Sequence, residues 1–402
     1  MVTIKRNSIT SQSFLMITFS GLTSIISLVG YSLAARNLPV QDVAKGILLT
    51  TIAWYATSLI DFGGSTYVVR EIMGERISLE VGKYFGLIKI ALLVPLLGLG
   101  LIFFHSQIGI VFRLFILIFL LLAINLMSIE FRTSGFTSAL SVVSLIEKTT
   151  LLFWLIITIY VNINIYFIDL IIISNFFAFC FALMLGNKSH SGFRPAKIKR
   201  LFIGSLGIGS SSAVTQIQIL DVNLLALKIG TLAASPYVLV TRWTNALGIF
   251  SNVFSQAIAP QVAKKNLTKT DILEVTKNTY LIFLSFIVCT LVAFQANNLV
   301  DFFLGEKFEN SGNIVRILAL ATILSTIAQP LSIVLQSRQN PWKVTLALIS
   351  GILCQFLYIF LFSAETGAIA AAYGFLLGQF ITTILLIYFS RILLISYLKF
   401  LF

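Results

Sequence analysis

Apolar stretches recur along the whole chain and are separated by short polar segments. A stretch of about 20 residues crosses the hydrocarbon core of a bilayer as an α-helix, because each residue adds ~1.5 Å. The alternating segments of roughly ten residues that are typical of membrane β-strands do not occur. The pattern predicts twelve membrane-spanning helices, near residues 13–35, 44–63, 84–104, 114–131, 142–160, 166–186, 201–228, 236–259, 279–297, 313–335, 343–362 and 367–390.

Composition supports an all-α polytopic membrane protein. The 402 residues are 58% hydrophobic and only 11% charged, whereas soluble domains carry roughly 25% charged residues. Backbone groups in lipid must be hydrogen-bonded internally, which favours helices. The first apolar run, from Phe14 to Ala35, follows Lys5 and Arg6 as in a signal peptide. It exceeds the roughly 7–15 apolar residues of such a peptide, so we expect an uncleaved helix.

The basic residues predict the orientation. An even number of helices places both termini on one side, and lysine and arginine accumulate in cytoplasmic loops. With the N-terminus inside, the cytoplasmic segments hold nineteen basic residues and the outer segments hold four. The expected topology is therefore N-in and C-in. It accounts for the net charge of +13 without a nucleic-acid partner.

Motifs for soluble-type catalysis or metal binding are absent from the sequence. Cys180, Cys289 and Cys354 are scattered singly within apolar runs, which predicts buried free thiols rather than disulfides or ligands. We expect a transporter rather than an enzyme, with no cofactor and no metal.

The largest polar segment between predicted helices, 186–200, is strongly basic and divides the chain into two groups of six helices. A duplicated six-helix unit with binding at the interface is a common transporter plan. We therefore expect an N-terminal lobe over 1–200, which includes this basic cytoplasmic loop, and a C-terminal lobe over 201–402, around a central cavity.

Polar residues form stripes at helical spacing on three predicted helices. Two interpretations stay open: close helix packing through small and polar residues, or the lining of a hydrated cavity. The stripes comprise Ser13, Ser20, Ser24, Ser27 and Tyr31; Ser205, Gly209, Ser212, Gln216 and Asn223; and Thr241, Asn245, Gly248, Asn252 and Gln256.

Charges inside predicted helices are candidates for function, because each costs ~3 kcal/mol or more at the bilayer centre. Asp221 and Arg242 lie at similar depth on consecutive helices and form either a structural ion pair or a switchable pair. Lys89 and Lys148 either extend to the cytoplasmic interface or face the interior. Glu147 points about 100° away from Lys148 on a helix, so helical spacing does not make it the automatic partner of Lys148.

Asp61 and Glu130 lie close to predicted cytoplasmic helix ends. Among the interior candidates, cations outnumber the one anion, Asp221, which suits an anionic cargo. The expected substrate-path residues are Lys89, Lys148, Gln216, Asp221, Arg242, Asn245, Asn252 and Arg316.

Short motifs along the chain resemble the Wzx-type polysaccharide flippases of the multidrug/oligosaccharidyl-lipid/polysaccharide exporter superfamily. The first is Leu33-Ala-Ala-Arg36-Asn-Leu-Pro39 leading to Gly46, and the second is Asp61-Phe62-Gly63 with Arg70-Glu71 after it. The region from Asp221 through Gly230 and Pro236-Tyr237 to Arg242, and Leu304-Gly305-Glu306, complete the resemblance. Its motif residues are Arg36, Asp61, Gly63 and Arg70.

This resemblance implies a two-lobed helical bundle in the bacterial inner membrane. The implied cargo is an undecaprenyl-diphosphate-linked oligosaccharide, such as an O-antigen unit, and the implied partners are membrane lipids and other polysaccharide assembly proteins. Two alternatives stay open. A drug/cation antiporter needs buried carboxylates, and the first predicted helix has none. A polysaccharide polymerase needs a sizeable outer loop, and the longest outer segment, about 295–313, is short.

Overall fold

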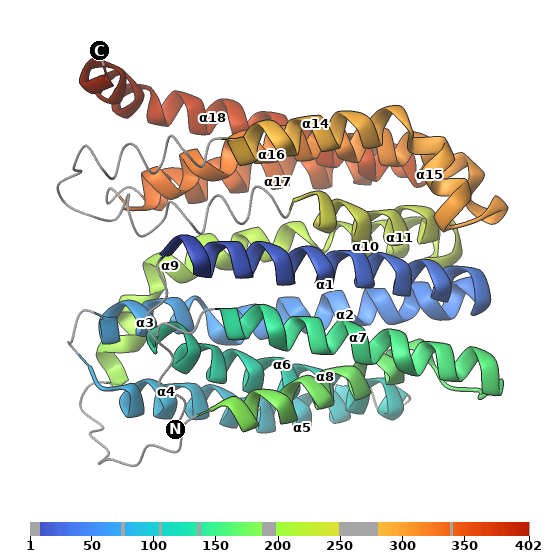
Figure 1. Ribbon diagram of the computed structural model, residues 1–402, viewed down its shortest axis with the longest axis horizontal. Helices are drawn as coiled ribbons and strands as arrows, with labels where there is room; N and C mark the ends of the chain where they lie inside the picture. The colour runs from blue at the N-terminus through green and yellow to red at the C-terminus, as the bar shows by residue number, and fades with distance from the viewer. Residues whose placement is uncertain are drawn as a thin grey trace. The chain divides into compact units, whose positions relative to one another are not determined.

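The computed structural model describes residues 9–73, 77–103, 107–134, 138–186, 198–248, 280–337 and 341–401. Helices joined by short turns make up this part of the chain, and it contains no strand (Figure 1). Backbone contacts divide the chain into two compact units, Met1–Leu220 and Asp221–Phe402. The all-α fold expected from the hydrophobic pattern is confirmed.

The first unit is built from nine described helices. Predicted helix 84–104 is broken into α4 and α5 at Leu92, and the short helix α3, which the hydrophobic pattern did not predict, follows α2. The helices are α1 (Ile9–Asn37), α2 (Val40–Asp61), α3 (Gly64–Met73), α4 (Leu79–Ala91), α5 (Leu93–Phe103), α6 (Ile108–Thr133), α7 (Ser138–Val161), α8 (Phe167–Leu185) and α9 (Ile198–Gln218).

Packing in the first unit brings together helices that are distant in sequence. α1 lies along α7, α2 lies against α6 and α8, and α3 packs on α4, α6 and α9. One apolar cluster, formed by residues of α3, α4, α6 and α9, is nearly inaccessible to solvent. It contains Val68, Val81, Phe85, Ile129 and Leu201. This cluster anchors α3 inside the unit.

The second unit contains seven described helices and one 3₁₀ segment. α16 and α17 each lie against α18, while α10 packs on α11 and α17. The elements are α10 (Asp221–Ile229), α11 (Thr231–Leu247), α14 (Tyr280–Phe294), α15 (Ala296–Phe303), η3 (Glu306–Ser311), α16 (Gly312–Ser337), α17 (Pro341–Thr366) and α18 (Ile369–Leu401).

Glycines bring α17 and α18 into backbone contact. A Cβ added at Gly378 would lie 2.8 Å from the carbonyl oxygen of Gly351 and 3.1 Å from the Cβ of Gln355. Small residues at a helix interface allow the backbones to approach this closely. The contact holds Gln355 at a defined place in the interior of the unit.

Nine of the described helices are long and apolar enough to cross a membrane, or ten if the bent pair 282–294 and 296–303 is one span. The chain is therefore a multi-pass membrane protein, although the predicted number of twelve spans is not confirmed. The predicted helix 201–228 is divided into α9 and α10. The predicted helix 236–259 begins within α11, and residues 249–279 lie outside the described residues.

The boundary between the compact units falls after Leu220, so α9 packs with the first unit. The sequence-based division into lobes 1–200 and 201–402 follows helix number rather than contacts, and it stays a prediction.

Candidate functional site

A sharp break separates α2 from α3, and it begins immediately after Asp61. Phe62 has φ 42° and ψ 46°, and Gly63 has φ 65°, so two successive residues are left-handed. Glycine adopts this conformation readily, whereas a residue with a Cβ does so at a cost of roughly 1–2 kcal/mol. Surrounding contacts must therefore hold Phe62 in place. We refer to residues 61–65 as the α2–α3 corner.

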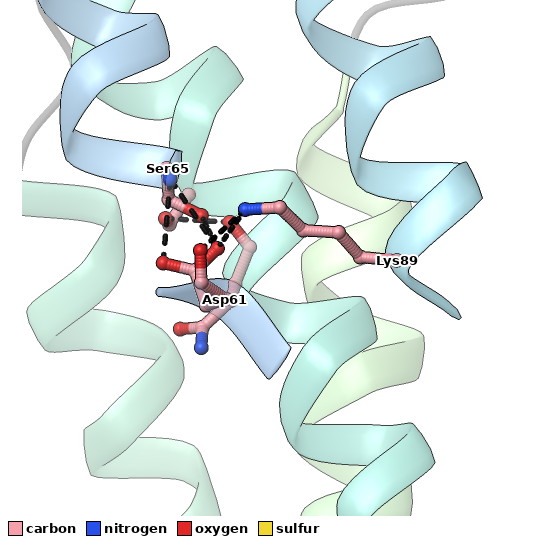
Figure 2. Close-up of polar contacts among 5 residues, drawn as sticks. Asp61, Ser65 and Lys89 are labelled. Atoms are coloured by element: carbon pink, nitrogen blue, oxygen red, sulfur yellow. Dashed lines mark hydrogen bonds and ion pairs between the residues drawn. The ribbon is translucent and has the colours of Figure 1, made fainter. Parts of the chain in front are cut away.

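An ion pair caps both helix ends at this corner (Figure 2). Lys89 Nζ, from α4, lies 2.8 Å from Asp61 Oδ1 and donates a second hydrogen bond to the Asp61 carbonyl oxygen at 2.6 Å. The Asp61 carboxylate also accepts hydrogen bonds from the Ser65 hydroxyl at 2.6 Å and from the Ser65 backbone N–H at 3.2 Å. Lysine thus satisfies the end of α2, and aspartate satisfies the start of α3.

The pair is enclosed by apolar and backbone atoms. Only 4% of the Lys89 side chain and 16% of the Asp61 side chain are exposed. Lys89 Nζ also lies 4.3 Å from the centre of the Phe85 ring, and a Cβ at Gly64 would collide with this ammonium. Lys89 therefore faces the interior of the first unit, where its ammonium lies at the end of α2.

The second buried carboxylate, Asp221, is held without a lysine. Its Oδ2 accepts hydrogen bonds from the Tyr237 hydroxyl and, at 2.8 Å, from Gln355 Nε2. Its Oδ1 accepts the Val222 backbone N–H at 2.6 Å. Tyr237 and Gln355 have no exposed surface, and Asp221 is 5% exposed. Within the described residues, every hydrogen-bond donor to Asp221 is uncharged.

Arg242, in α11, contributes to this site through its electrostatic interaction with Asp221. The hydrogen bonds of Asp221 instead join three elements of the second unit, because Tyr237 belongs to α11 and Gln355 to α17. The site is therefore a carboxylate bound by neutral groups, with a guanidinium in electrostatic range.

Glu147 is the partner of Lys148, although helical spacing alone did not identify it as such. Lys148 Nζ lies 2.6 Å from Glu147 Oε1, and about 15% of each side chain is exposed. Adjacent residues point apart at Cβ, but the long lysine and glutamate side chains bend back toward each other in an apolar environment. Glu130, in the last turn of α6, is also buried in the first unit, and its Oε2 lies 2.7 Å from Lys83 Nζ.

The remaining expected path residues are dispersed. Gln216, in the last turns of α9, is half-buried, and its Oε1 accepts no hydrogen bond from the described residues. Arg316 donates to Asn313 at 2.9 Å near the start of α16, and Arg36 is exposed at the end of α1. Lys228 is exposed and lies 3.6 Å from the Phe360 ring centre.

Part of the predicted set lies outside the described residues. This applies to Asn252 and Gln256, and to the side chains of Ser13, Arg70, Ser212 and Asn245.

The described parts of two polar stripes make helix contacts. Ser20 Oγ lies 3.3 Å from Ser141 Oγ, between α1 and α7. A Cβ at Gly209 would collide with the carbonyl oxygen and the ring of Phe62, while Ser205 is 3% exposed. These contacts favour the packing interpretation for this part of each stripe.

Three residues of the two carboxylate sites were not predicted from the sequence, namely Ser65, Tyr237 and Gln355. Gln355 carried a signal, because an amide within the apolar run 343–362 needs a partner in lipid. Ser65 and Tyr237 carried none beyond their place near the motifs. The distance in sequence between Lys89 and Asp61, 28 positions, hid their pairing.

Comparison with known proteins shows the class of fold. No family model matches the sequence, and no curated protein matches it. Among solved structures, the lipid II flippase MurJ in an inward closed conformation is similar over 94% of this chain and 87% of its own chain, with a TM-score of 0.76 and 14% identity.

Two structures of a multidrug resistance MATE family transporter of the MOP superfamily are also similar. The inward-facing conformation has a TM-score of 0.69 at 14% identity, over 96% of this chain and 99% of its own. The outward-facing conformation has a TM-score of 0.65 at 15% identity, over 98% and 96%. The chain therefore has the fold of the MOP-superfamily transporters, as the motif resemblance implied.

Proposed function

We propose that this protein is a flippase that moves an undecaprenyl-diphosphate-linked oligosaccharide, an O-antigen unit or a related surface polysaccharide unit, from the inner to the outer leaflet of the bacterial cytoplasmic membrane. The observation that carries the proposal is the similarity of nearly the whole chain to a lipid II flippase. The short motifs around Arg36, Asp61–Gly63 and Asp221–Arg242 support the polysaccharide branch of that fold.

In the proposed mechanism, the glycan and the diphosphate cross between the two halves while the lipid tail stays in the bilayer. The halves rock against each other in alternating access, as in other transporters with internal repeats. The cell interior is negative, so outward passage of an anion is favoured by ~2.3 kcal/mol per charge per 100 mV. This bias acts in the direction of export.

The proposed path has less unpaired positive charge than the sequence suggested. Lys89 and Lys148 are paired with Asp61 and Glu147, which lowers the net positive charge available to a diphosphate. Arg242 is half-buried, whereas only 4% of the Lys89 side chain is exposed. We therefore expect Arg242 to contribute more to binding of the anionic cargo than Lys89 does.

Gene deletion tests the proposal directly. A deletion strain should lose the surface polysaccharide and accumulate lipid-linked units on the cytoplasmic leaflet, and the plasmid-borne gene should restore both. A normal polysaccharide ladder in the deletion strain would contradict the proposal.

Single variants connect the proposal to residues. We expect Arg242→Ala and Lys148→Ala to lower polysaccharide export when each variant is present at the wild-type level in the membrane. The matched control is Lys45→Ala, which removes an exposed lysine near the start of α2. Unchanged surface glycan in both variants would remove these residues from the path.

The two alternatives are tested by separate assays. A drug/cation antiporter would raise drug resistance when overexpressed, and the MATE-like fold is the observation that favours it. A polymerase would leave lipid-linked single units exposed on the outer leaflet after deletion. Trapping of those units on the inner leaflet distinguishes the flippase from both.

A further inference from the structure

The α2–α3 corner has contacts with two different helices on its two sides. On one side Lys89, from α4, binds the Asp61 carboxylate and carbonyl. On the other side α9 lies against the corner with its glycines, because a Cβ at Gly209 would collide with the Phe62 carbonyl and ring. The charged contact and the glycine contact therefore involve adjacent residues of one short segment.

The glycine contact extends along α3. A Cβ at Gly204 would collide with the ring and hydroxyl of Tyr67, which lies in the first turns of α3. Ser205, between the two glycines, is 3% exposed. Gly204 and Gly209 of α9 thus fit against Tyr67 and Phe62 in the broken α2–α3 geometry.

That geometry depends on the ion pair. Phe62 is left-handed although it has a Cβ, and its neighbours on both sides are held by Lys89 and Asp61. Removal of the ammonium leaves the Asp61 carbonyl buried without its donor and leaves the carboxylate with its Ser65 donors but without its counter-charge. Phe62 then gains by returning to a right-handed conformation, and its carbonyl moves away from Gly209.

We propose that the Asp61–Lys89 pair is a latch for the docking of α9 on the first unit. The closed latch keeps the corner in the shape that Gly204 and Gly209 fit, and opening it releases α9. α9 ends at Gln218, three positions before the first residue of the second unit. The latch therefore controls the segment of the first unit that leads into the second, and this inference does not depend on the cargo.

Crosslinking between cysteines measures the docking of α9. In a full-length chain with Cys180, Cys289 and Cys354 replaced by alanine, cysteines at Tyr67 and Gly204 report the α3–α9 contact with a short bifunctional methanethiosulfonate. Cysteines at Ser20 and Ser141, whose Oγ atoms lie 3.3 Å apart, report α1–α7 packing in the same unit. This second pair is the matched control for global unfolding.

Lys89→Met keeps most of the length of the side chain and removes its charge, and it should slow crosslinking at 67/204 several-fold while leaving 20/141 unchanged. Asp61→Asn is the second variant, because it keeps the capping oxygen and removes the ion pair, and it should act in the same direction. Unchanged crosslinking at 67/204 in both variants would overturn the proposal. Parallel loss of both crosslinks in both variants would also overturn it, since the ion pair would then hold the whole unit.

Discussion

Each unit contains a buried aspartate, and the two carboxylates are stabilised by different partners. Asp61 lies at the break before α3 and accepts hydrogen bonds from Ser65, and Asp221 is the first residue of α10 and accepts the Val222 N–H. Each carboxylate therefore lies at the N-terminal end of a helix, where the helix dipole stabilises negative charge. Asp61 also forms an ion pair with Lys89 at 2.8 Å, whereas Asp221 also accepts hydrogen bonds from Tyr237 and Gln355.

This difference determines what each site can tolerate. A buried ion pair depends on both charges, since the loss of one leaves the other without compensation. A carboxylate held by neutral donors depends on hydrogen-bond geometry, and each donor contributes separately. The Asp61 site should therefore respond to changes of charge, and the Asp221 site to changes of individual hydrogen bonds.

The largest effect is expected for Lys89→Met. This variant leaves the Asp61 carboxylate and carbonyl buried without the ammonium, and breaking a buried pair in this way costs about 3–5 kcal/mol. Thermal unfolding of the purified protein in detergent should show a large fall in Tm. The double variant Asp61→Asn with Lys89→Met should recover part of it, and a double variant as unstable as the single one would contradict the role of the charge.

An intermediate effect is expected for Tyr237→Phe, which removes one donor from the buried Asp221 carboxylate. A hydrogen bond to a charged group contributes about 1.5–3 kcal/mol, so the free energy of unfolding should fall by that amount. Tyr160→Phe is the matched control, because Tyr160 is 86% exposed. Equal stabilities of the two variants would show that the tyrosine hydroxyl does not hold Asp221.

A smaller effect than at Asp61 is expected for Asp221→Asn. The amide keeps an oxygen for Tyr237 and Gln355, but its NH2 group faces the Val222 N–H and the negative charge near Arg242 is lost, so the free energy of unfolding should fall by about 1–3 kcal/mol. The same chemical change at Asp61 removes the partner of a buried lysine and should cost about 3–5 kcal/mol. Comparison of the two Asn variants by unfolding in one detergent tests the contrast, which equal losses would refute.

The membrane-spanning helices were predictable because each carries its own signal. An apolar run such as 343–362 must be helical in lipid wherever its neighbours lie, and α17 spans Pro341–Thr366. The motif Asp61-Phe62-Gly63 likewise indicated a helix end, and α2 ends at Asp61. Asp221 and Arg242 were identified as candidates from their depth in the predicted helices, while two positions stayed open for Lys89.

The interaction partners of the buried charged residues could not be predicted in the same way. Helical spacing did not identify the Glu147–Lys148 pair, since it describes where Cβ atoms point and not where a long side chain ends. The partner of Lys89 lies 28 positions away on another helix, and Gln355 reaches Asp221 across 134 positions. No local rule relates such residues.

The sequence by itself determined a helical, multi-pass membrane protein with charges inside its apolar segments, because the hydrophobic effect and backbone hydrogen bonding act on each segment separately. The tertiary structure alone decided how those charges are neutralised. Asp61 meets a lysine because α4 packs beside the α2–α3 corner, and Asp221 meets a glutamine because glycine contacts with α18 hold Gln355 in the interior, where α17 lies against α10. A buried charge requires a partner, and only the packing of helices distant in sequence determines which residue that partner is.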